Sequence, residues 1–167
     1  MTRVVLVPGV LALLPEYAGI EDPVVELRAA CLAAVGWLGV DVEVLADPQG
    51  ERVGRALLDA AEVSRQSLAR RPQPARNHLV VGNGSARRSK QAPGHLDERS
   101  IAFDDGLREW LFGGAGSWDA VLGAELLASM RGFELMAERL GSWGEPVVDY
   151  DDDPFGVQYW VMRWEVP

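Results

Sequence analysis

Short apolar runs alternate with longer segments of helical spacing along the first half of the chain. The runs 3–8, 41–46 and 77–82 are apolar or alternate between apolar and polar positions, which is typical of strands. The segments 23–38 and 51–70 carry apolar residues along one side, which predicts amphipathic helices. Strand, helix, strand, helix and strand in succession predict an α/β fold with parallel strands.

The second half of the chain predicts further helices and a closing pair of strands. Three helices are predicted by an apolar stripe over 103–111, a segment from Ser117 to about Ser129, and a stripe over 133–140. Residues 145–166 predict two strands about a turn rich in Asp, Pro and Gly.

The last predicted strand is apolar on both of its faces. Alternate residues of 155–161, beginning with Phe155, share one face, while Trp160, Met162 and Trp164 share the other. Such a strand belongs inside a sheet, under helices on each side. We therefore expect one α/β domain over 1–167, with a mostly parallel central sheet, helices on both faces and a closing C-terminal β-hairpin.

Composition and charge exclude several classes of protein. The 167 residues favour one domain over two, and a content of 48% apolar and 25% charged residues argues against extensive disorder. A net charge of −9 disfavours nucleic acid or a membrane surface as a partner. The apolar start is interrupted by Pro8 and Gly9 and lacks a small-residue cleavage site, so we expect a cytoplasmic protein.

One loop concentrates the polar chemistry of the chain. Residues 80–98, VVGNGSARRSKQAPGHLDE, pass from a strand through a glycine-rich turn to the cations Arg87, Arg88 and Lys90, and then to His95. Ligands of open α/β sheets bind at the carboxyl ends of strands, and glycines let backbone amides face an anion. Planar guanidinium groups match carboxylate or phosphate. The loop is therefore a candidate anion site, with a solvated surface loop as the alternative.

Other reactive groups have a structural explanation. Cys31, the single cysteine, falls on the apolar side of a predicted helix, which is typical of a core residue. His78 begins a strand, and a zinc site built on two histidines and one cysteine would need added carboxylates. The acidic run 149–153 lacks the spacing of a calcium loop, so we expect a solvated turn. Ser85 stands outside a G-x-S-x-G elbow, which argues against nucleophilic catalysis.

The chain holds six tryptophans, and two of them bear on assembly. Trp160 and Trp164 lie near the carboxyl terminus, where they could leave an apolar patch for a homo-oligomer. The alternative, which we favour for most of the six, is that they fill the core.

The order of these features resembles the class III extradiol ring-cleaving dioxygenases, the LigB-like superfamily that includes the Memo-like proteins. It looks closest to the short, Ala- and Arg-rich, uncharacterised members of that superfamily found in actinobacteria. Four stretches carry the resemblance, namely VLVPGVLALLPEYAG (5–19), VVGNGSARRSKQAPGHLDERSIAFDDGLREWL (80–111), ASMRGFELMAERLG (128–141) and VVDYDDDPFGVQYWVMRW (147–164).

The resemblance implies that the family's metal ligands are missing from this chain. Active members hold a nonhaem Fe(II) through two histidines and a glutamate, and use a further histidine as acid and base. Gly9 corresponds to the histidine of the opening loop, while Asn83 and Ala86 correspond to the Asp and His of the G-D-x-S-H loop. Residues 40–74 contain no histidine. The candidates for the glutamate are Glu125 and Glu134.

Glycine and alanine neither bind iron nor move a proton, so we expect a catalytically degenerate protein without a cofactor. It would bind a small ligand, for which an anion is one option, or a protein partner. The alternative is a divergent metal-dependent ring-cleaving dioxygenase or related oxidoreductase that holds Fe(II). A purely structural or assembly role is a third reading.

The resemblance and the loop chemistry together place the expected pocket between the opening loop and the 83–95 loop. The expected ligand contacts are Gly9, Tyr17, Asn83, Ser85, Arg87, Arg88 and His95. If the protein were an enzyme with rebuilt chemistry, His95 and Asp97 would be its acid–base candidates.

Overall fold

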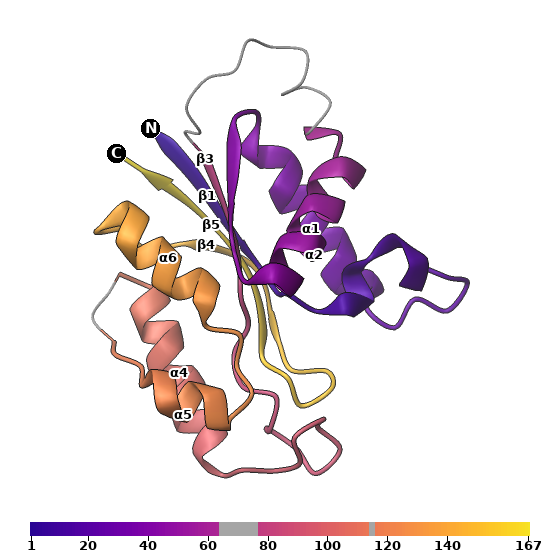
Figure 1. Ribbon diagram of the computed structural model, residues 1–167, viewed down its shortest axis with the longest axis vertical. Coiled ribbons are helices and arrows are strands. Elements are labelled where there is room, and N and C mark those ends of the chain that lie inside the picture. The colour runs from indigo at the N-terminus through magenta and orange to yellow at the C-terminus, as the bar shows by residue number, and fades with distance from the viewer. Residues whose placement is uncertain (64–76, 114–115) are drawn as a thin grey trace.

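A mixed five-stranded sheet forms the centre of the protein in a computed structural model that describes residues 1–63, 77–113 and 116–167 (Figure 1). Its strands, in chain order, are β1 (Thr2–Val7), β2 (Val42–Leu45), β3 (Asn77–Val81), β4 (Val147–Asp152) and β5 (Tyr159–Val166). Their spatial order is β2-β3-β1-β5-β4. β2, β3 and β1 run parallel, and β5 is antiparallel to both β1 and β4.

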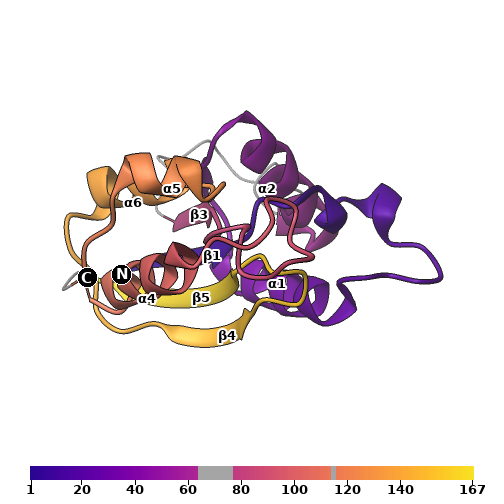
Figure 2. The same ribbon diagram turned by 90° about the horizontal axis from the view of Figure 1, so that it is seen from below.

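Helices cover both faces of this sheet, as Figures 1 and 2 show. One face carries α1 (Val25–Leu38) and α2 (Pro48–Ala60), together with the short 3-10 helices η1 (Leu11–Leu13) and η2 (Pro15–Tyr17). The other face carries α4 (Arg99–Leu111), α5 (Ala120–Glu125) and α6 (Arg131–Leu140). The predicted α/β class, with helices on both faces and a closing C-terminal hairpin, is confirmed.

β5 packs into a separate apolar core on each of its faces. Tyr159 and Val161 lie in the core beneath α1 and α2, whereas the tryptophans Trp160 and Trp164, which are 1% and 2% exposed, lie in the core beneath α4 and α6. The suggestion that these two tryptophans leave an apolar patch is therefore wrong. Phe155 was also misplaced by the prediction, because it is 44% exposed and lies in the turn that precedes β5.

The starts of α2 and α5 differ from the prediction because a capping aspartate decides where each helix begins, and α1, predicted from 23, begins at Val25. Asp47 accepts a hydrogen bond of 2.7 Å from the Gly50 amide, so α2 begins at Pro48 and not at 51. Residues 64–70 of that predicted helix lie outside the described part of the chain. Asp119 caps α5 in the same way, so the helix expected from Ser117 begins three residues later and ends at Glu125.

Cys31 is fully buried, as predicted, and its burial raises the pKa of the thiol. Within the described residues, no helix combines the length and the apolar character that a membrane crossing requires.

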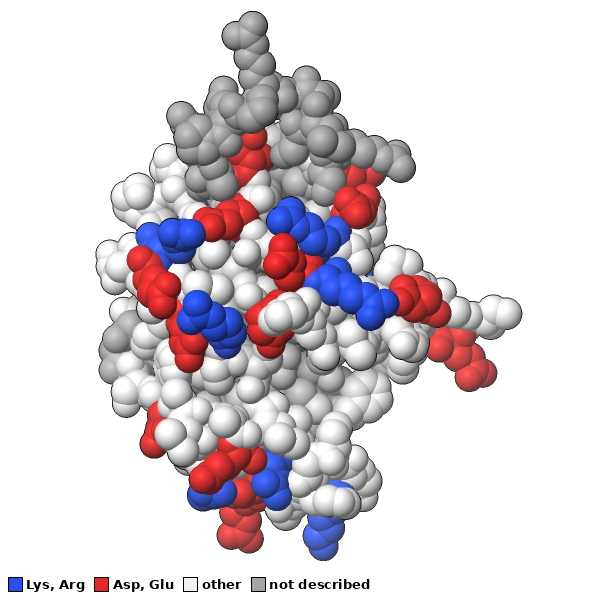
Figure 3. Space-filling view, in the orientation of Figure 1, with Lys and Arg blue, Asp and Glu red and all other residues white. Residues whose placement is uncertain are grey.

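Charges on the face drawn in Figure 3 are interspersed, and cations lie next to carboxylates. Arg139 contacts Glu43 at 2.7 Å, and Arg52 contacts Glu16 at 2.8 Å. Exposed pairs of this kind contribute little to stability, but they leave no broad patch of a single sign on this face.

α6 starts directly against the ends of two strands, which makes Gly132 a stability determinant. A Cβ added there would lie 2.8 Å from the carbonyl carbon of Val81 and 3.0 Å from the Leu45 oxygen, and it would clash with the Val81 oxygen. We expect Gly132→Ala to lower the free energy of unfolding by about 3 kcal/mol, measured by urea denaturation.

Gly36 provides the matched control, because it lies exposed within α1 with no atom within 4 Å of an added Cβ. Gly36→Ala should raise the free energy of unfolding by about 0.5–1 kcal/mol. Equal effects of the two substitutions would show that α6 does not sit against the strand ends in this way.

Candidate functional site

The glycine-rich loop leaves the carboxyl end of β3, at the end of the sheet opposite the two chain termini (Figure 1). Its first residue, Gly82, donates its amide to Val7 at the end of β1, at 3.0 Å. Asn83 exchanges backbone hydrogen bonds of 3.3 and 3.0 Å with Ser129, which precedes α6. The loop is therefore anchored to both neighbouring segments as soon as it begins.

The opening loop and the 83–95 loop contact each other directly. The Gly9 amide donates to Asn83 Oδ1 at 3.4 Å, and Asn83 is buried. A Cβ at Gly9 would lie 3.2 Å from Val81 Cγ1, which is tighter than an ordinary contact. The structure thus brings together two of the predicted ligand contacts, but they bond to each other.

A buried carboxylate occupies the centre of the predicted anion site. Asp104, on α4, is 2% exposed. Its Oδ1 accepts the Ser85 amide at 2.8 Å, and its Oδ2 accepts the Ser85 hydroxyl at 2.6 Å and Arg88 Nη1 at 2.9 Å. A glycine-rich turn, a hydroxyl and a guanidinium do converge on an anion, as the sequence suggested. That anion belongs to the protein itself.

Three further amides near the start of the loop are also engaged. The amide of Gly84 donates to Gln158 at 2.9 Å, that of Ala86 to Leu126 at 2.9 Å, and that of Arg88 to Gly156 at 3.0 Å. The loop is thereby joined to the start of β5, the end of α5 and the hairpin turn. An external anion would have to displace Asp104 to reach the donors at Ser85 and Arg88.

Arg88 is shared between two carboxylates. Its Nε donates to Asp153 at 2.6 Å, in addition to the bond from Nη1 to Asp104. Burial raises the pKa of Asp104 above its ordinary value, although the bonds from Ser85 and Arg88 act in the opposite direction. Since one cation faces two carboxylates, the charge of Arg88 is offset by its own partners.

The acidic run of the hairpin is explained by similar pairs. Asp149 accepts bonds of 2.6 and 2.9 Å from Arg163, and Asp151 accepts a bond of 2.8 Å from Arg108 on α4. Asp151 also accepts a bond of 2.9 Å from Gln158. In the part of the chain that the structure describes, no group of three or more His, Cys, Asp or Glu side chains is arranged to hold a metal ion.

His95 and Asp97 lie at the far end of the loop. Among the described residues, no hydrogen bond joins their side chains. His95 is exposed, with a positive φ of 57°. Asp97 accepts bonds of 3.1 and 2.8 Å from the Arg99 guanidinium, whose hydrogen bonds hold the pKa of Asp97 at about 2. Asp97 is therefore a fixed anion at neutral pH.

The other predicted residues are dispersed. Tyr17 is exposed on η2, which borders a cavity together with α1 and α2. Arg87 Nη1 donates to the Glu125 carbonyl at 3.2 Å. The glutamates Glu125 and Glu134 lie on different helices, and each contacts an arginine, at 2.9 and 3.0 Å. His78 is buried in β3, and its burial lowers the pKa of the imidazole.

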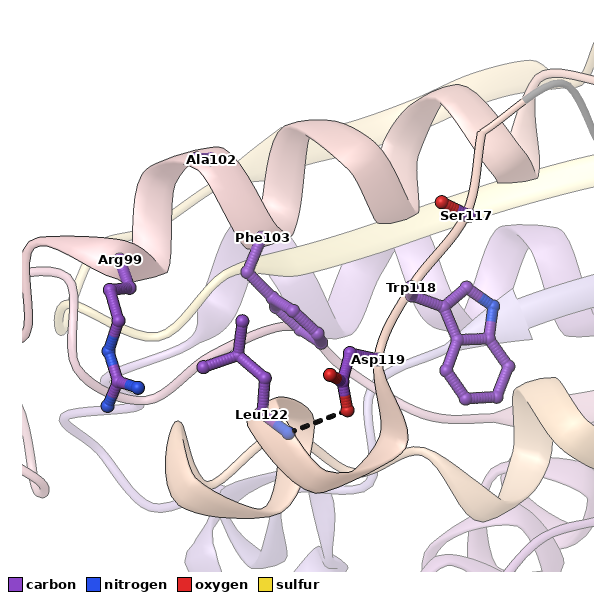
Figure 4. Close-up of a pocket in the computed structure, with 7 residues that line it drawn as sticks. All are labelled: Arg99, Ala102, Phe103, Ser117, Trp118, Asp119 and Leu122. Atoms are coloured by element: carbon purple, nitrogen blue, oxygen red, sulfur yellow. Dashed lines mark hydrogen bonds between the residues drawn. The ribbon is translucent and has the colours of Figure 1, made fainter.

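A cavity of about 500 Å³ lies between α4 and α5, and we call it the α4–α5 groove (Figure 4). Motif analysis missed it because its walls come from packing and not from a motif. Two smaller cavities, of about 250 and 160 Å³, lie beside α6 and between η2 and the α1–α2 pair. The residues that line the α4–α5 groove are Arg99, Ala102, Phe103, Ser117, Trp118, Asp119 and Leu122.

Asp104 is the residue at the centre of the loop contacts that a periodicity argument could have found. It is a polar residue three and seven positions before Leu107 and Leu111, so it shares their buried side of α4. A carboxylate on a buried helix face needs donors, and the sequence offers Ser85 and Arg88 in the preceding loop.

Comparison of the chain with protein-family models, with curated proteins and with solved structures finds no match. The resemblance to the extradiol dioxygenases stays a prediction.

The Asp104 contacts generate a stability prediction. Asp104→Ala leaves the Ser85 and Arg88 donors without their acceptor, so we expect a loss of about 3 kcal/mol in the free energy of unfolding. Asp105→Ala, on the exposed side of the same helix, should change it by less than about 0.5 kcal/mol. Urea denaturation of both variants measures the difference.

The same variant tests whether the loop is an anion site filled from within. Sodium formate, at about ten times its Kd, should restore roughly 1.4 kcal/mol to Asp104→Ala, or about 3–5 °C in Tm. Sodium chloride at matched ionic strength should not, and the wild-type protein should gain nothing specific from formate. Equal responses to the two salts would contradict the anion-site geometry.

Proposed function

We propose that this protein is a noncatalytic binding domain that holds a small molecule in the α4–α5 groove. The observation that carries the proposal is the groove itself. Its volume of about 500 Å³ falls within the range of roughly 300–1,000 Å³ that is usual for small-molecule sites. Phe103 supplies an aromatic face, Trp118 also lines the groove, and Arg99 and Asp119 supply charged groups that can orient a ligand.

The glycine-rich loop has a positioning role in this proposal. Arg87 accepts hydrogen bonds at its carbonyl from the Asp97 amide at 2.9 Å and from the Ser100 hydroxyl at 3.1 Å, which fixes the start of α4. Its side chain and the Ala86 amide bond to the carbonyls of Glu125 and Leu126 at the end of α5. The loop therefore holds both helices that border the groove.

The noncatalytic part of the proposal follows from the resemblance together with the local packing. Gly9, Asn83 and Ala86 stand where the family has its acidic and histidine residues, and all three are buried in this protein. Ser85, which the family's loop shares, is fully buried and bonded to Asp104. The scaffold would then be retained while its former reaction centre serves to stabilise the fold.

A fragment screen against matched variants tests the location of the site. Small aromatic fragments that bind the wild-type protein, detected by ligand-observed NMR, should lose affinity more than about tenfold in Ala102→Trp, because the indole fills the groove. Ala124→Trp, exposed on α5 outside the groove lining, should leave binding unchanged, and so should His95→Asn in the loop. Loss of binding in His95→Asn but not in Ala102→Trp would move the site to the loop.

Metal content tests separately whether the protein lacks an iron site. Purified protein incubated anaerobically with Fe(II) and then freed of excess metal should contain no stoichiometric iron by elemental analysis. Near-stoichiometric iron, retained after desalting, would favour the alternative of a divergent dioxygenase.

A further inference from the structure

Carboxylates outnumber guanidinium groups around the α4–α5 groove. Arg99, at one end of the groove, donates to Asp97 at 3.1 and 2.8 Å and to Glu125 at 2.9 Å. Its charge is thus opposed by two carboxylates, and the pKa of Asp97, at about 2, keeps that carboxyl ionised at neutral pH. A ligand carboxylate approaching Arg99 would meet two like charges that already occupy the guanidinium.

Asp119 presents a partly unused carboxylate to the same groove. Both of its hydrogen bonds, from the amides of Val121 at 2.8 Å and Leu122 at 3.1 Å, are accepted by Oδ1. Its Oδ2 accepts no hydrogen bond from the residues the structure describes. In Figure 4 this oxygen lies on the side of Phe103 and Leu122. Asp119 is exposed, so a ligand group can reach it.

The wall beside Asp119 is apolar and aromatic. Phe103 is buried on α4, and Leu122 on α5 faces it across the groove (Figure 4). Trp118 is held edge-on against Trp110, with ring centroids 5.9 Å apart and planes at 85°. Aromatic rings attract cations through their negative faces and bury apolar ligand groups at little entropic cost.

We propose that the α4–α5 groove selects a small organic cation, namely an ammonium group carried on an aromatic body. The ammonium pairs with Asp119 Oδ2, and the ring packs against Phe103 and Leu122. This inference rests on the proposed function, because it names the ligand class of the same groove. The remaining negative charge of the Arg99 cluster favours the cation further, since two carboxylates surround one guanidinium.

Three probes of one shape and different charge test the selection. They are 2-phenylethylammonium, neutral 2-phenylethanol and anionic 3-phenylpropanoate, titrated at constant ionic strength with tryptophan fluorescence and ligand-observed NMR as readouts. The ammonium should bind severalfold more tightly than the alcohol, and the propanoate should bind most weakly.

Asp119→Asn isolates the charge from the helix cap. Asparagine caps a helix as well as aspartate does, so α5 should remain folded, which circular dichroism checks. The affinity for the ammonium should fall about fivefold, as expected for an accessible ion pair, while that for the alcohol stays the same. Glu109→Gln, an exposed acidic residue of α4 outside the groove lining, controls for the loss of one negative charge and should change neither affinity.

Each outcome decides the inference. Alcohol or propanoate binding as tightly as the ammonium, and blocked by Ala102→Trp, would overturn the cation selection while leaving the proposed function in place. An equal loss of alcohol and ammonium binding in Asp119→Asn would also overturn it, because the effect would then be structural. If none of the three probes binds, the inference fails, and the fragment screen with Ala102→Trp decides the proposed function separately.

Discussion

The buried carboxylate of Asp104 is the interaction on which the arrangement of this end of the protein depends. A carboxylate removed from water is costly unless donors surround it, and here the Ser85 amide, the Ser85 hydroxyl and Arg88 do so. Satisfying it fixes the path of the glycine-rich loop across the carboxyl end of the sheet. Arg88 then reaches Asp153, so the same contact also joins the loop to the C-terminal hairpin.

The loop also holds in place the two helices that form the groove. The Arg87 carbonyl accepts hydrogen bonds at the start of α4, and the Arg87 side chain donates one at the end of α5. The Ala86 amide donates to Leu126. A loop whose composition is typical of anion binding thus acts as a structural element, and the open cavity lies between the helices it supports. The polar groups of a loop can all be bonded within the protein itself. The accessible site can then lie on neighbouring elements whose sequence carries no motif.

Periodicity was enough to predict the sheet and most helices, because strands β1, β3 and β5 are apolar in the pattern of buried strands. Donor chemistry was also predicted, since Ser85 and Arg88 do converge on an anion. The partner was not predicted, because the acceptor Asp104 lies 19 and 16 residues further along the chain and is brought back only by the packing of α4. The groove was missed for the same reason, since Arg99, Phe103 and Asp119 come together only when α4 and α5 pack.

The most direct test of this account is a backbone amide chemical-shift map of isotope-labelled protein during titration with a bound small molecule. The account predicts that the largest shifts fall within the segments 99–103 and 117–122, which contain the residues that line the groove, and that the amides of 83–88 stay close to their free positions. Shifts centred on 83–88, with the groove residues unchanged, would contradict it, because the loop would then be an open binding site and not a closed support.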